Sequence, residues 1–99
     1  MFDRYVQVSS TKRSRIQRIC RRWPVSRLAL FGSRARGTAR RSSDYDLVVD
    51  FQKHYAPTLF DLGELQSELA EALEAPVDLL TSGAAQDILK NAQVLFERN

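Results

Sequence analysis

The 99-residue sequence has one cysteine, one histidine and no hydrophobic run long enough to span a membrane. A single cysteine, Cys20, excludes an internal disulfide and favours a reducing compartment. A single histidine, His54, has no second histidine or cysteine near it in the sequence, which argues against a zinc site. The first residues lack the basic segment and long apolar segment of a secretory signal. These absences predict a soluble, cytoplasmic protein that makes no contact with membranes.

Acidic residues are nearly absent from the first 43 positions, which carry twelve Lys or Arg and one Asp. Residues 44–99 have the opposite bias, with three basic and eleven acidic residues. This division predicts a surface that attracts nucleotides, other polyanions or an acidic protein. The basic segment lacks interleaved aromatic residues and any recognised nucleic-acid-binding motif, so we do not expect nucleic-acid binding. The glutamates of segment 64–74 could meet a basic partner or form a solvated helix face.

The spacing of apolar residues predicts alternating helices and strands. Helical spacing of apolar residues begins near Ser9 and ends at Pro24. A second amphipathic helix is expected through Leu62–Leu73. Its cap is expected near Thr58 or Asp61, with Glu64 in a capping box. The remaining expected segments are strands at 25–31, 45–51 and 77–80, a short helix at 33–38, a last helix at 82–91, and a core-closing segment at 94–96. Together they predict one α/β domain over residues 1–99, with a small mixed three-stranded sheet flanked by helices.

The most informative segment is residues 32–46, where a Gly-Ser turn and an Asp-Tyr-Asp stretch lie between two apolar strands. Alternate side chains of a strand share a face, so we expect Asp44 and Asp46 to project together. Neighbouring carboxylates repel each other, and a divalent cation is the usual reason that a site tolerates them. Gly32 and Ser33 can offer backbone N–H groups and a hydroxyl to phosphate oxygens. This combination predicts phosphoryl or nucleotidyl transfer.

A third carboxylate, Asp78, lies inside an apolar segment, where a lone charge is costly unless a partner compensates it. If its strand lies beside the strand 45–51, Asp78 joins Asp44 and Asp46 at one edge of the sheet. Three clustered carboxylates can hold two Mg²⁺ ions, which clamp a triphosphate and neutralise the leaving pyrophosphate. A cap of the strand end is the simpler explanation of Asp78 alone, but the upstream motif favours the metal site.

The segment Gly32-Ser33, ten residues, then Asp44-Tyr45-Asp46 resembles the signature of the DNA polymerase beta-type nucleotidyltransferase superfamily. With Ala35-Arg36-Gly37 inside the segment and Ser43 before the first acid, it is similar to the minimal nucleotidyltransferase (MNT) branch. The resemblance covers residues 10–96 and implies a polymerase beta-like nucleotidyltransferase core.

The resemblance also implies a role for each matching residue. Asp44, Asp46 and Asp78 would be the catalytic acids and the metal ligands, binding Mg²⁺ together with the phosphates of ATP. Asp78 would complete one metal site and could take the proton from the attacking hydroxyl. The implied nucleotide-binding residues are Gly32, Ser33, Arg34 and Arg36.

Proteins of the MNT branch are commonly antitoxins paired with HEPN-domain ribonuclease toxins. The resemblance implies a Mg²⁺-dependent enzyme that transfers AMP from ATP to a tyrosine hydroxyl of such a toxin, neutralising it within a hetero-oligomer. Two alternatives stay open: an antitoxin that blocks its toxin by binding alone, and an enzyme that modifies a small molecule, as aminoglycoside nucleotidyltransferases do. The intact set of acids argues against the first, and the short chain, with little room for an acceptor pocket, argues against the second.

Overall fold

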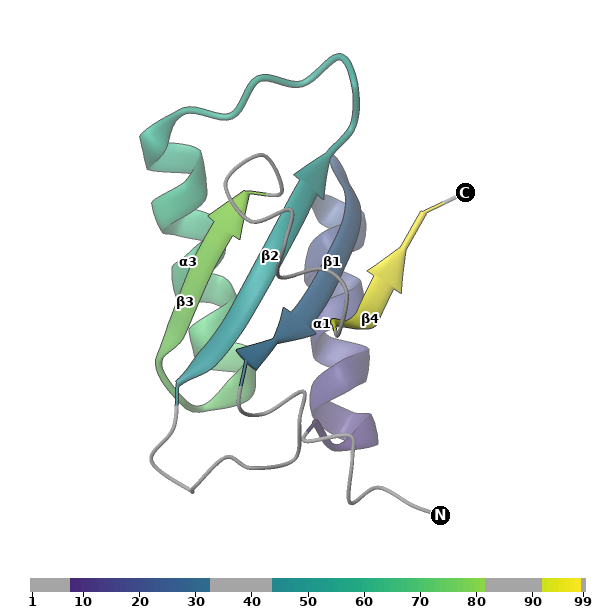
Figure 1. The fold of residues 1–99 in the computed structure, drawn as a ribbon, viewed down its shortest axis with the longest axis vertical. Coiled ribbons are helices and arrows are strands. Elements are labelled where there is room, and N and C mark those ends of the chain that lie inside the picture. Colours follow the sequence, from purple (N-terminus) through teal and green to yellow (C-terminus); the bar gives the residue numbers. More distant parts are fainter. Residues whose placement is uncertain (1–7, 33–43, 82–91, 99) are drawn as a thin grey trace.

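The computed structural model describes residues 8–32, 44–81 and 92–98, which form one sheet and two helices (Figure 1). In chain order the elements are α1 (Ser10–Arg22), β1 (Val25–Phe31), β2 (Tyr45–Phe51), α3 (Leu59–Leu73), β3 (Val77–Thr81) and β4 (Gln93–Glu97). The sheet has the order β3-β2-β1-β4, and both helices lie against the same face. β2 pairs antiparallel with β1 and parallel with β3, and β1 pairs antiparallel with β4. The predicted mixed α/β sheet is confirmed, with four strands instead of three.

The additional strand is β4. It includes segment 94–96, for which the sequence predicts only that it closes the core. Leu95 and Phe96 are buried in the main core, and Phe96 pairs with Leu28 of β1. Three consecutive apolar residues carry no strand periodicity, so the pairing with β1, far away in the sequence, is not visible from the segment itself. The helices expected at 33–38 and 82–91 lie outside the described residues.

The main core fills the space between the sheet and the two helices. Along β2 the side chains alternate, so that Tyr45, Leu47 and Val49 enter this core while Val48 joins a small cluster on the opposite face. That opposite face is also the face to which Asp46 belongs. The completely buried members of the main core come from both helices and from the strands: Ile16, Cys20, Val25, Leu28, Leu30, Leu47, Leu65 and Leu69.

Both helices begin at a hydrogen-bonded cap. Ser9 accepts from the backbone N–H of Lys12 at 3.3 Å and starts α1. The hydroxyl of Thr58 accepts from the backbone N–H of Asp61, whose carboxylate accepts from the N–H of Thr58 at 2.9 Å. The expected capping box is therefore present at Thr58, but its partner is Asp61 and the expectation for Glu64 is wrong, because α3 begins at Leu59 and its third residue is Asp61.

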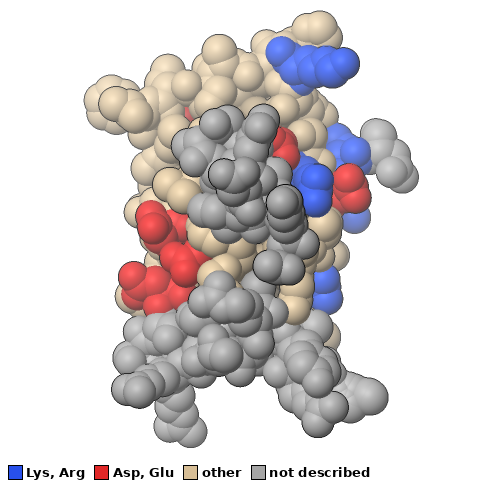
Figure 2. All heavy atoms as spheres, viewed as in Figure 1, with Lys and Arg blue, Asp and Glu red and all other residues tan. Residues whose placement is uncertain are grey.

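The basic helix α1 and the acidic helix α3 lie side by side, which brings the two oppositely charged parts of the sequence together. Arg15 pairs with Glu74 at 3.4 Å, and Arg22 pairs with Glu68 at 3.2 Å. The side of the molecule opposite the helices differs: among the described residues, Figure 2 shows acidic side chains gathered near the β3 edge and most basic ones toward the β4 side. None of the helices within the described ranges is long and apolar enough to cross a membrane.

Candidate functional site

The parallel pairing of β2 and β3 places Asp46 and Asp78 directly opposite each other. The two residues are register partners on adjacent strands. Opposed residues of a parallel pair point to the same face, and neighbouring strands lie about 4.8 Å apart. The ladder begins at the backbone N–H of Tyr45, which donates to the carbonyl of Pro76 at 3.0 Å. Both carboxylates therefore belong to the sheet face opposite α1 and α3, near the beginning of each strand.

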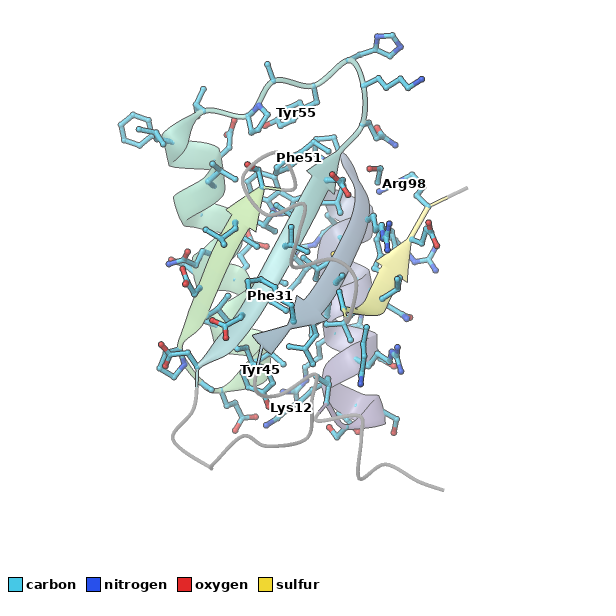
Figure 3. All side chains as sticks on the ribbon, in the orientation of Figure 1. Lys12, Phe31, Tyr45, Phe51, Tyr55 and Arg98 are labelled. Carbon is cyan, nitrogen blue, oxygen red and sulfur yellow. The ribbon has the colours of Figure 1, made fainter. Side chains whose placement is uncertain are left out.

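Asp44 lies two residues before Asp46, at the entry to β2, and it is exposed. The period of two along a strand assigns it to the same face as Asp46. Asp78 is also exposed. Asp46 is half-buried and lies nearest to the turn after β1. Figure 3 labels Tyr45 and Phe31 at this end of the sheet, and Phe51 and Tyr55 at the other end.

The chemistry of these side chains fits Mg²⁺, although the described residues alone do not form a complete metal site. In the part of the chain that the structure describes, no three His, Cys, Asp or Glu side chains stand in an arrangement that would hold a metal ion. Mg²⁺ prefers oxygen ligands and commonly takes only one or two carboxylates from a protein, with substrate phosphates and waters as the other ligands. Asp46 and Asp78, with Asp44 two residues before Asp46 in the sequence, match this sharing of ligands between protein and nucleotide.

Gly32 follows β1 and lies directly against Asp46. Phe31, the last residue of β1, is the register partner of Asp46 in the antiparallel pair. Gly32 has a φ of +76°, which side-chain-bearing residues rarely adopt. A Cβ atom at this position would also collide with Oδ2 of Asp46 and lie 3.2 Å from its Cγ. Glycine is thus required here for backbone conformation and for the close approach of a carboxylate.

The other residues singled out in the sequence are placed as follows. Ser33, Arg34 and Arg36 lie outside the described residues, and their roles stay predictions. His54 is exposed in the loop after β2, away from the acids. Cys20 is buried in the core, and burial raises the pKa of its thiol to about 12, against a smaller opposing effect of Arg98. Its thiol is therefore neutral and packs as an apolar group.

One contact to the acid-bearing strand has no signal in the sequence. The side-chain Oε1 of Gln66, on α3, accepts from the backbone N–H of Leu79 at 3.3 Å. Leu79 follows Asp78 directly on β3. An exposed glutamine on an amphipathic helix is an ordinary surface residue, so nothing in the sequence marks it out.

A shallow groove lies on the helix layer, on the other side of the sheet from the acids. Its floor is apolar, and its walls carry arginines of α1 opposite glutamates of α3; the lining residues are Arg15, Arg18, Ile19, Arg22, Glu68, Glu71 and Ala72. Two of these arginines are in ion pairs across or beside the groove. The charged side chains of the two helices thus pair with each other at this groove. Exposed ion pairs of this kind contribute little to stability.

Comparisons with known proteins agree with this architecture. A family model described as a nucleotidyltransferase domain matches residues 13–98, which include every described helix and strand apart from the first turn of α1. The protein adenylyltransferase MntA of Thermococcus cleftensis is 38% identical over 74 residues, which are 70% of this chain and 73% of that protein.

Solved structures extend the likeness to three dimensions. A minimal nucleotidyltransferase is 32% identical, with a TM-score of 0.69 over 82% of this chain and 86% of that one. One chain of a toxin–antitoxin crystal structure with AMP-PNP is 26% identical, with a TM-score of 0.73 over 88% of this chain and 74% of that one.

Proposed function

Since this chain belongs to the nucleotidyltransferase domain family, in its minimal nucleotidyltransferase branch, we propose that it transfers AMP from ATP to a tyrosine hydroxyl of a HEPN-domain toxin. Modification of the toxin neutralises it, so the chain acts as an antitoxin in the cytoplasm. The relative that is named a protein adenylyltransferase and the toxin–antitoxin structure with an ATP analogue support this choice of reaction, donor and partner. The single observation that carries the proposal is the opposition of Asp46 and Asp78 beside Gly32.

The proposed reaction is an in-line displacement at the α-phosphorus of ATP. The tyrosine oxygen forms a bond to that phosphorus, and the bond from the phosphorus to the oxygen bridging the α- and β-phosphates breaks. Pyrophosphate leaves with the bonding electron pair, and the hydroxyl proton passes to a carboxylate or to water. Catalysis then depends mainly on positioning and on neutralisation of charge.

Each acid has a distinct task in this proposal. Asp44 and Asp46 would hold Mg²⁺ together with the phosphates, and Asp78 would be the third acidic ligand and would accept the proton of the attacking hydroxyl. When bound, Mg²⁺ supplies charge neutralisation on the triphosphate and on the departing pyrophosphate. The turn at Gly32 keeps the carboxylate of Asp46 against the backbone that begins the phosphate-binding segment.

The remaining nucleotide contacts come from the segment after β1. Ser33 offers its hydroxyl and backbone N–H to the β- and γ-phosphates, and Arg34 and Arg36 add positive charge to the same phosphates. Their position immediately after Gly32 in the sequence supports this assignment.

The test compares Asp46→Asn with a matched variant, Asp50→Asn. Both aspartates lie on β2 and share a face, but Asp50 is four residues farther on, in register with Arg27 of β1 and away from Asp78. The wild type and both variants are mixed with the HEPN toxin, ATP and Mg²⁺, and the toxin is weighed by mass spectrometry. We expect adenylylated toxin with the wild type and with Asp50→Asn, and none with Asp46→Asn, while circular dichroism shows that all three are folded.

Two results would contradict the proposal. Full transfer by Asp46→Asn would remove the carboxylate from the mechanism. Protection from the toxin by the wild type without added nucleotide mass would instead support an antitoxin that acts by binding alone.

A further inference from the structure

Among the described strands, the acid-bearing strand β3 lies at an edge of the sheet, and a side chain of α3 forms a hydrogen bond to its outer side. The sheet order leaves β3 with one neighbouring strand, β2. On the other side, Oε1 of Gln66 accepts from the backbone N–H of Leu79 at 3.3 Å. This N–H belongs to the peptide unit that joins Leu79 to Asp78. The contact therefore acts on the backbone of the residue that carries the third carboxylate.

The direction of the backbone groups along β3 explains why this contact is available. In a strand, N–H and C=O groups of successive residues point alternately to the two sides. The carbonyl of Pro76 faces β2, where it accepts from Tyr45. The groups of Asp78 then also face β2, and those of Leu79 face outward. Gln66 thus satisfies an outward donor of an edge strand that has only five residues.

The opposite edge of the sheet has the same device. There the side-chain Nε2 of Gln17, on α1, donates to the carbonyl of Leu95 on β4, also at 3.3 Å. Each edge strand thus shares a hydrogen bond with a glutamine of the helix beside it, and β4 receives a second one from α1, since Arg13 donates to the carbonyl of Val94 at 2.9 Å. Only β3 carries an acid of the candidate site. A comparison of the two glutamines therefore separates the loss of stability that follows removal of such a bond from any effect on the site.

We infer that Gln66 is a positioning residue for Asp78, which holds β3 at the register and tilt that set this carboxylate opposite Asp46. The inference rests on the proposed function of Asp78. Without the bond from Gln66, β3 would be hydrogen-bonded on one side only, and a strand held in this way can shift or fray at its end. Asp78 is the second of the five residues of β3. A displacement of about 1 Å in a catalytic group can cost about 100-fold in rate.

The test uses Gln66→Leu, Gln66→Glu and the control Gln17→Leu. Leucine removes the acceptor, whereas glutamate keeps an oxygen at the same reach. We expect Gln66→Leu to lower kcat for toxin adenylylation about tenfold and to raise the Mg²⁺ concentration for half-maximal rate, with KM for the toxin unchanged. Gln66→Glu is expected to restore most of the rate. Gln17→Leu removes a glutamine bond of the same length from the other edge strand, where Arg13 still donates to Val94, and should leave kcat and the Mg²⁺ dependence unchanged while Tm falls no more than in Gln66→Leu.

A double variant shows whether Gln66 acts through Asp78. If it does, Gln66→Leu has no further effect on kcat once Asp78→Asn is present. Hydrogen exchange gives a second, activity-independent readout, in which the Leu79 amide loses protection in Gln66→Leu and regains it in Gln66→Glu.

The outcomes separate this inference from the proposed function. If Asp78→Asn retains full activity, the proposed role of Asp78 fails and the inference fails with it. If Asp78→Asn is impaired but Gln66→Leu behaves like Gln17→Leu, the positioning role alone is refuted.

Discussion

Gly32 lies against the carboxylate of Asp46 so closely that no Cβ atom fits between them. The two residues belong to the two halves of the Gly-Ser and Asp-x-Asp motif, and they meet because Phe31 pairs with Asp46 across the β1–β2 ladder. The register of β1 and β2 therefore brings the two parts of the motif together. It sets the turn that begins the proposed phosphate-binding segment against the acid to which the proposed mechanism gives a metal-binding role.

Replacement of Gly32 by alanine is expected to damage both the fold and the site. The φ of +76° costs a side-chain-bearing residue about 1–2 kcal/mol, and the added methyl group pushes the Asp46 carboxylate out of place. We expect Gly32→Ala to unfold at a lower urea concentration and to show no measurable AMP transfer, even at temperatures at which it is fully folded.

Gly63 provides the matched control. It lies inside α3, and an added Cβ atom would meet nothing within 4 Å. Gly63→Ala is expected to stabilise the protein by about 0.5–1 kcal/mol, because alanine restricts the unfolded chain and favours the helix. Its transfer activity should equal that of the wild type. Equal losses of activity in Gly32→Ala and Gly63→Ala would contradict the proposed role of the contact between Gly32 and Asp46.

The capping box of α3 should make stability depend on pH in acid. The N–H of Thr58 and the hydroxyl of Tyr55, which donates at 2.8 Å, lower the pKa of Asp61 below its ordinary value of 3.8. A carboxyl group with a lowered native pKa stabilises the fold above the unfolded-state value, and this contribution is lost as pH falls through the native value. Asp61→Asn should therefore be less stable than the wild type at pH 7, and the difference should shrink below about pH 4, as measured by urea unfolding. A constant difference from pH 7 to pH 2 would contradict this role of Asp61.

Arg98 fastens the C-terminal strand to the end of α1. Its guanidinium donates to the carbonyls of Cys20 and Val25 at 2.9 Å and of Trp23 at 3.0 Å, and lies 5.6 Å from the ring centroid of Phe96. These carbonyls include the unsatisfied ones at the end of a helix, where positive charge is also favourable. Arg98→Ala is expected to destabilise the fold by about 2–3 kcal/mol, because several charge-assisted bonds are lost together.

Arg98→Lys should recover only part of this loss, since an ammonium group cannot match the fork of the guanidinium. Arg18→Ala is the control, because Arg18 is exposed and lies in the α1–α3 groove. Its effect is expected within about 0.5 kcal/mol of zero by thermal or urea unfolding. An Arg98→Ala variant as stable as Arg18→Ala would show that the bonds of Arg98 contribute nothing.

The sequence predicts those parts of the fold that depend on local periodicity. The alternation of β2 correctly assigns Leu47 and Val49 to the core and Asp46 to the other face, because the period of a strand is independent of its neighbours. The start of α3 is harder to predict, since Leu59 and Phe60 are apolar but 85% and 89% exposed. They conceal the amphipathic pattern in the first turn, and the capping partner is therefore misassigned to Glu64.

The features that remain hidden in the sequence depend on pairing between distant segments. Nothing local indicates that β4 pairs with β1, and the contact between Gly32 and Asp46 follows only from the register that sets Phe31 opposite that acid. The pairing of Arg22 with Glu68 is likewise hidden, because a charged helix face has the same pattern whether it meets water, a partner or another helix.

The parallel pairing of β2 with β3 has a consequence for the way activity is lost on heating. Asp46 and Gly32 meet within a hairpin, but Asp46 and Asp78 are neighbours only while β3, at the end of the crossover through α3, is paired with β2. Loss of the β2–β3 ladder separates the acids while the hairpin still stands. The proposed transfer should therefore cease at a lower temperature than the one at which the hairpin melts, and its loss would report the detachment of β3.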